Sequence, residues 1–123
     1  MKFQIARSPT FAPLLALFSA TRGRSFINVE PDEIEIRFGF THQRIPRSEI
    51  RSVSLQKERP WYARSIGWRT NLKGGVSLVG TSFNLVKIEH ALPRKIFVGI
   101  SVLASEIIVS LEHPTQFVAA LHA

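Results

Sequence analysis

The chain has 123 residues, of which 45% are hydrophobic and 20% are charged, so we expect one globular domain with its own core. It contains no cysteine, which excludes disulfides, thiolate metal sites and a cysteine nucleophile. The formal net charge of +7 indicates an anionic partner or serves solubility alone.

The first 24 residues are predicted to form an N-terminal extension containing a short helix or strand. Within residues 8–20, an apolar run from Phe11 to Phe18 is interrupted by Pro13, and we favour a short helix there. A secretory signal needs an uninterrupted apolar core and a small residue where Phe18 stands. The run is also far shorter than a membrane-spanning helix requires. We therefore expect neither a signal peptide nor a transmembrane segment.

From Ser25 onward the pattern is typical of strands. Hydrophobic Ile34, Ile36 and Phe38 alternate with charged residues, which predicts a strand with one buried face. The segment 30–33 contains a proline and predicts a turn from a strand that ends at residue 29. Gly39 is expected to reverse the chain into a third strand, which ends at residue 46.

Six further strands and one helix are predicted in the rest of the chain. The strands fall at residues 53–57, 63–70, 76–80, 84–90, 94–100 and 105–111. Pro114 suits a first helical turn, and apolar residues follow it at helical spacing, which predicts a C-terminal helix within residues 113–123. We therefore predict a mainly β domain, with a bent antiparallel barrel or sandwich over residues 25–112 and the helix as its cap.

No catalytic signature is present. The histidines, His42, His90, His113 and His122, lack metal-ligand spacing, no serine lies in a nucleophile turn, and the Glu33–Glu35 pair lies on the expected solvent face of its strand. We therefore predict a protein that is not an enzyme and that uses no catalytic residues, cofactor or metal.

One basic and aromatic stretch, residues 59–75, is the candidate binding site. Alternation places Trp68 in the core. Trp61 follows a proline in an expected loop, where it either is exposed beside arginines or folds back as a lid over the barrel end. Arginine binds phosphate bidentately, and indole suits a membrane interface, a stacked base or a protein hot spot. The candidate anion- or partner-binding residues are Arg59, Trp61, Tyr62, Arg64, Arg69 and Lys73.

Three segments carry a resemblance to a known family. In order and spacing, "RIPRSEIRSVSL", "GWRTN" and "VSLEHPTQFVAAL" resemble bacterial pleckstrin-homology-like domain proteins of uncharacterised function, over roughly residues 25–123. The resemblance implies a strongly bent antiparallel sandwich capped by the C-terminal helix. His113 departs from the family pattern, which has an acidic residue before the proline. A fold of this kind hosts lipid, peptide and protein binding, so the resemblance names no single function.

The positive charge is regional, because segment 37–73 holds nine basic residues against only Glu49 and Glu58. Two functions remain open. The first is a non-catalytic pleckstrin-homology-like module that binds a protein partner or self-associates. The alternative is peripheral binding of anionic membrane headgroups, or with less support nucleic acid, through that region. No small-molecule substrate is evident, and we expect a cytoplasmic protein, peripheral to the membrane under the second hypothesis.

Overall fold

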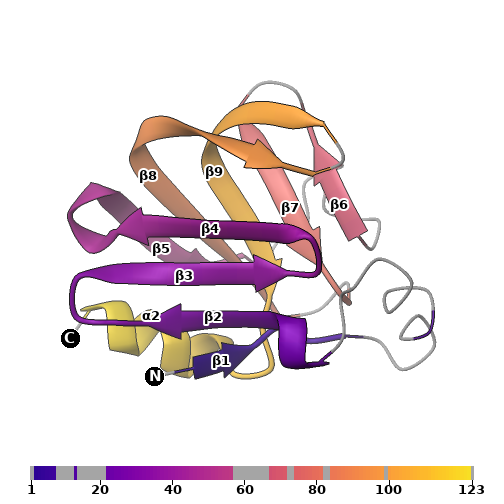
Figure 1. The fold of residues 1–123 in the computed structure, drawn as a ribbon. Helices are drawn as coiled ribbons and strands as arrows, with labels where there is room; N and C mark the ends of the chain where they lie inside the picture. The colour runs from indigo at the N-terminus through magenta and orange to yellow at the C-terminus, as the bar shows by residue number, and fades with distance from the viewer. Residues whose placement is uncertain are drawn as a thin grey trace.

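The structure is a computed structural model that describes residues 2–7, 13, 22–56, 67–71, 74–81, 84–98 and 100–122. These residues form two β-sheets and a C-terminal helix around one main hydrophobic core (Figure 1), and Val79, Leu85 and Ile108 form a second, smaller cluster. The predicted mainly β class with a C-terminal helix is confirmed. The elements are β1 (Lys2–Gln4), η1 (Arg22–Arg24), β2 (Ser25–Val29), β3 (Glu33–Phe38), β4 (Thr41–Pro46), η2 (Arg47–Glu49), β5 (Ile50–Leu55), β6 (Gly67–Thr70), β7 (Gly75–Val79), β8 (Leu85–Phe97), β9 (Ser101–Ser110) and α2 (Pro114–His122).

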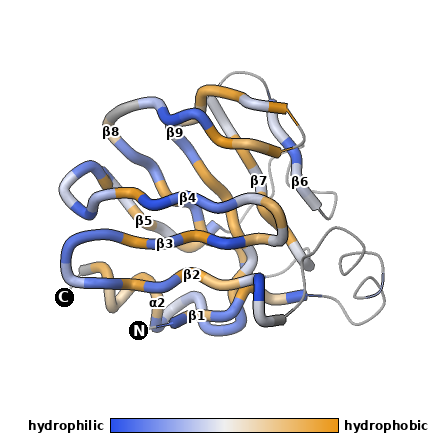
Figure 2. Tube along the Cα trace, viewed as in Figure 1, coloured by the Kyte–Doolittle hydropathy of each residue, from blue (hydrophilic) through white to orange (hydrophobic). Residues whose placement is uncertain are grey.

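The first sheet is an antiparallel meander in the order β1-β2-β3-β4. Along it, hydrophilic and hydrophobic residues alternate (Figure 2). The side chains of Ile34, Ile36 and Phe38 are fully buried, whereas Glu33, Glu35 and Arg37 face outward. The predicted alternation is therefore confirmed, because one face of this sheet covers the core.

The second sheet has the order β5-β8-β9-β7-β6, and one of its pairings is parallel. Strand β9 lies between β8, to which it is antiparallel, and β7, to which it is parallel. The prediction of an entirely antiparallel sheet is wrong at this pair. Ile107, Ile108 and Val109 are consecutive and all buried, which is typical of a central strand covered on both faces. The two sheets remain separate, so the barrel alternative gives way to two sheets that share a core.

Strand β8 joins two segments that the sequence predicts as separate strands, 84–90 and 94–100. The pairing with β9 shifts register between Glu89 and Arg94, so β8 is one long strand with an irregularity. Strand β5 begins at Ile50, earlier than the predicted start at residue 53, and ends at Leu55. The described part of the predicted strand 63–70 is β6.

The N-terminal residues belong to the fold, which the prediction of an extension did not anticipate. β1 pairs with β2, and the chain then forms bridges from Ile5 to Leu111 and from Arg7 to Gly80, so it contacts both sheets. The Ser110 hydroxyl donates to the Ala6 carbonyl over 2.9 Å and accepts the Gly80 N–H over 2.9 Å. A Cβ at Gly80 would collide with that carbonyl, so glycine is required there. The predicted helix or strand in residues 8–20 lies outside the described residues, apart from Pro13.

Helix α2 closes one end of the core, as its apolar spacing predicts. Phe117 is fully buried and contacts Phe3 edge to face, with ring centroids 5.3 Å apart. The Arg47 guanidinium donates to the carbonyl of Leu121 near the helix end, which satisfies a carbonyl that the helix leaves open. None of the described helices is long and apolar enough to cross a membrane.

Candidate docking surface

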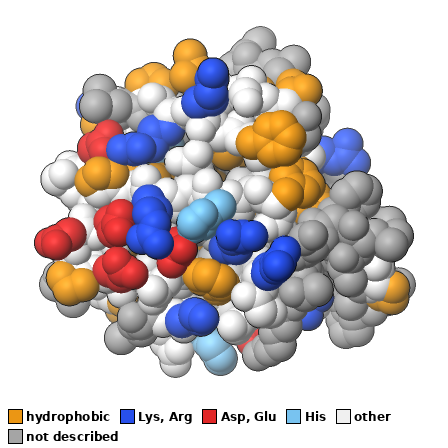
Figure 3. Space-filling model, viewed as in Figure 1, with side chains coloured by type: hydrophobic (Ala, Val, Ile, Leu, Met, Phe, Trp, Pro, Cys, Tyr) orange, Lys and Arg blue, Asp and Glu red, His pale blue; other side chains and the backbone are white. Residues whose placement is uncertain are grey.

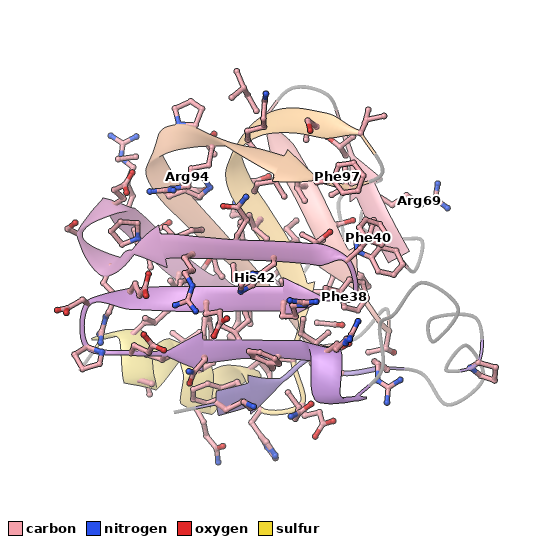
Figure 4. The ribbon with its side chains drawn as sticks, viewed as in Figure 1. Phe38, Phe40, His42, Arg69, Arg94 and Phe97 are labelled. Atoms are coloured by element: carbon pink, nitrogen blue, oxygen red, sulfur yellow. The ribbon has the colours of Figure 1, made fainter. Side chains whose placement is uncertain are left out.

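A row of aromatic rings leads from the core to the surface at the β3–β4 turn (Figure 4). Gly39 adopts a φ of 60° in this turn, which places Phe38 in the core and Phe40 at the surface. Trp68 of β6 is half-buried between them, with its ring centroid 4.6 Å from each. Its indole N–H donates to the Phe38 carbonyl over 2.9 Å. Phe97 continues the row, 5.4 Å from Phe40 and edge to face.

The hairpin that joins β8 to β9 adds further exposed hydrophobic side chains. We call residues 94–98 and 100–104 the distal hairpin; its cross-strand pairs run from Arg94–Ala104 to Phe97–Ser101. The exposed fraction is 48% at Phe97, 57% at Ile100 and 66% at Leu103. Hydrophobic patches of this kind mark interaction sites more often than isolated exposed residues do.

Four cations belong to the segments that carry or adjoin these apolar side chains. Arg69 adjoins Trp68 in β6, and Lys95 lies opposite Leu103 in the distal hairpin. The carbonyl of Arg24 accepts the Gly39 N–H, and the Arg37 guanidinium donates to the Gly39 carbonyl. We define the docking surface as Phe40, Phe97, Ile100 and Leu103 together with Arg24, Arg37, Arg69 and Lys95.

Carboxylates of the described chain pair with other cations. Arg44 contacts Glu33 over 2.9 Å and Glu35 over 3.3 Å. The hydrogen bond that Arg44 donates to Glu33, together with the charge of Glu35, raises the pKa of Arg44 above its ordinary value. Lys87 and Arg94 are likewise held by carboxylates: Glu89 and Glu106 for Lys87, Glu49 for Arg94. Within the described residues, no carboxylate lies at ion-pair distance from the four cations of the docking surface.

The charges are accordingly separated across one face of the molecule. Figure 3 shows acidic side chains gathered on the left of this face, and exposed hydrophobic side chains with basic neighbours on the right. The β3–β4 hairpin spans this separation, because Glu33 and Glu35 lie toward its open end and Arg37 lies beside its turn.

The structure describes one of the six predicted site residues. Arg69 is exposed on β6 and belongs to the docking surface. The other five, Arg59, Trp61, Tyr62, Arg64 and Lys73, lie outside the described residues, as does the choice between an exposed and a lid-like Trp61. Trp68, predicted as core, lies half-buried at the rim of the core cluster.

The described cations of the predicted basic region do not lie on one surface. Of its described cations, Arg37 and Arg69 reach the docking surface, whereas Arg44 is held in ion pairs and Arg47 donates to carbonyls. Arg51 lies on the edge strand β5, at the opposite edge of the second sheet from β6. The sequence interpretation missed Arg24, Lys95, Phe40, Phe97, Ile100 and Leu103, which the strand pairing brings to one place.

The other polar clusters of the described residues give weaker indications of a functional site. His42 contacts Glu35 over 2.6 Å on the solvent side of the first sheet. A pocket of about 340 Å³ at the β8 irregularity is lined in part by Arg51, His90 and Ser105, with the Lys87-bound carboxylates Glu89 and Glu106. No group of three metal-ligating side chains occurs in the part of the chain that the structure describes.

The sequence was compared with protein-family models, with curated proteins and with solved structures, and none of the three comparisons returned a match.

Proposed function

We propose that this protein is a non-catalytic, pleckstrin-homology-like binding module that attaches peripherally to anionic membranes, at their cytoplasmic side, through the docking surface. The observation that carries the proposal is the combination of exposed apolar side chains with four cations that no described carboxylate neutralises. A membrane with anionic headgroups offers the matching chemistry, because it presents phosphate charge above hydrocarbon.

Electrostatic attraction to an anionic membrane would supply part of the binding free energy. Each Lys or Arg close to an anionic membrane contributes about 1 kcal/mol, so four cations together contribute about 4 kcal/mol. That alone corresponds to weak, millimolar-range attachment. Additional stabilisation then has to come from the apolar side chains of the same surface.

A protein partner or self-association, the first hypothesis from the sequence, has less support in the charge distribution. The centres of protein interfaces are depleted in charged residues and enriched in aromatic residues. Phe40 and Phe97 fit that composition, but Lys95 is exposed two residues before Phe97 on β8, and exposed Arg69 follows Trp68 on β6. Self-association would bring these like charges of two copies together, which is unfavourable.

The test is co-sedimentation of the full chain with vesicles. One set contains phosphatidylcholine alone and the other adds phosphatidylserine, each at low and at physiological salt. We expect binding only to the anionic vesicles and a marked loss of binding as salt rises, because screening shortens the reach of exposed charges.

Two outcomes would overturn the proposal. The first is the absence of binding to anionic vesicles at low salt. The second is preferential binding of DNA, measured by adding duplex or single-stranded competitor at equal phosphate concentration. Strong competition would assign the cations to nucleic acid, whose binding also falls with salt.

A further inference from the structure

We infer that the distal hairpin inserts into the hydrocarbon boundary of the membrane, while Arg37, Arg69 and Lys95 remain at the phosphates. This inference rests on the proposed function and deepens it: the partner is a lipid bilayer entered by Ile100 and Leu103, and not merely an anionic surface.

The distal hairpin extends beyond the sheet from which it comes. Strand β7 pairs with β9 only along Glu106–Val109 of β9, and β5 pairs with β8 only along Val86–His90 of β8. The four pairs from Arg94–Ala104 to Phe97–Ser101 have no further ladder partner among the described strands. Figure 1 shows this part of β8 and β9 curving over the top of the molecule. The inner face of the hairpin is buried at Ile96 and Ala104, whereas Lys95, Phe97 and Leu103 are exposed on its outer face. This outer face can meet a planar bilayer without requiring the rest of the domain to enter it.

The hairpin is held in place at its base and along one side. Arg94 forms an ion pair with Glu49. The Thr41 hydroxyl donates to the Phe97 carbonyl over 2.6 Å, and the Gln43 amide donates to the Lys95 carbonyl over 2.7 Å. Because these contacts order the hairpin before binding, insertion costs little additional conformational entropy.

The outer side of the hairpin combines exposed apolar side chains with a cation. Exposure increases from Phe97 toward Ile100 and Leu103, so these two residues bury the most apolar surface on insertion. Lys95 is the cross-strand partner of Leu103, and its long side chain allows the ammonium to reach the headgroups while its methylenes remain in an apolar layer. Aromatic Phe40 and Trp68 lie beside the hairpin, where a headgroup boundary favours rings.

The first experiment removes the apolar side chains and preserves the charge. The double variant Ile100→Ser/Leu103→Ser is compared with Leu55→Ser, an exposed leucine on β5 at the other edge of the second sheet. We expect the double variant to lose about tenfold or more in affinity for phosphatidylserine-containing vesicles. Leu55→Ser should stay within about twofold of the wild type. Thermal melts of both variants check that they are folded.

The second experiment measures depth directly. The chain has no cysteine, so Ile100→Cys provides a single labelling site for an environment-sensitive fluorophore, and Ser54→Cys on β5 provides a matched control. With vesicles carrying nitroxide quenchers on the acyl chains, we expect a blue shift and quenching for the label at position 100. The label at position 54 should keep its aqueous emission.

The outcomes separate this inference from the proposed function. Salt-sensitive vesicle binding with an aqueous label at position 100 and no effect of the double variant would overturn insertion and leave headgroup binding intact. Failure of the wild type to bind anionic vesicles would overturn both. If sedimentation velocity shows a dimer that the double variant abolishes, the hairpin binds a second copy of the chain, and insertion is overturned.

Discussion

The two ends of the β3–β4 hairpin carry similar charged residues in different settings. Toward the open end, Arg44 contacts Glu33 and Glu35, so the charges neutralise one another on the sheet surface. At the turn, Arg37 donates to the Gly39 carbonyl, and Phe40 is exposed beside it. Basic residues at the two ends therefore differ in their surroundings, and only Arg37, at the turn, combines an exposed neighbouring ring with the absence of a carboxylate partner among the described residues. This difference is why we propose a binding surface at the turn and not at the open end.

The largest expected effect distinguishes the two phenylalanines on either side of Gly39. Phe38→Ala removes a fully buried ring and should lower the free energy of unfolding by about 3–5 kcal/mol, through lost burial and a cavity. Phe40→Ala removes a ring that is 38% exposed and should cost less than about 1.5 kcal/mol. Urea denaturation of both variants measures the difference. Equal losses would show that Phe40 is a core residue and does not belong to a docking surface.

The second prediction concerns Trp68, which connects the core to the surface. Trp68→Phe keeps an aromatic ring between Phe38 and Phe40 but removes the hydrogen bond to the Phe38 carbonyl. The expected loss of stability is about 1 kcal/mol, the usual contribution of one such bond. A thermal melt followed by circular dichroism checks this. A loss as large as that of Phe38→Ala would mean that the indole fills space in the core that a phenyl ring cannot.

The smallest effects on stability are expected for the arginines at the two ends of the hairpin. Arg44→Gln should change the free energy of unfolding by less than about 0.5 kcal/mol, because exposed ion pairs contribute little. Arg37→Gln also removes a hydrogen bond to the Gly39 carbonyl and should cost no more than about 1 kcal/mol. Their vesicle affinities should differ. Arg37→Gln removes one docking cation and should weaken binding about fivefold, whereas Arg44→Gln should leave binding near the wild-type value. Equal weakening by both would show that total charge matters and its location does not.

The elements that were predicted correctly are those with a clear local pattern in the sequence. The alternation of polar and apolar residues from Glu33 to Phe38 predicts a strand with one buried face, and the structure contains that strand. Pro114 and the apolar spacing behind it predicted α2 in the same way. Strand β1 was missed because three residues are too short for a periodicity, and its stability comes from pairing with β2.

The docking surface could not be predicted because it is assembled by long-range pairing. Phe40 and Phe97 are far apart in sequence and come together through the contact of β4 with the distal hairpin. Two of its cations, Arg24 and Lys95, lie outside the basic region 37–73, so the distribution of charge along the sequence did not point to them. The parallel pairing of β9 with β7 was also missed, because the hydrophobic pattern of a strand does not indicate which strand it pairs with.

The most direct test of the account compares two charge reversals of equal size. Arg69→Glu/Lys95→Glu alters the docking surface, and Lys2→Glu/Arg51→Glu alters exposed cations on β1 and β5. Each double variant lowers the net charge by the same amount, so general electrostatic attraction is matched. In co-sedimentation with phosphatidylserine-containing vesicles, the docking-surface variant should lose about thirtyfold or more in affinity. The control should lose less than about threefold, and equal losses in the two variants would contradict the account.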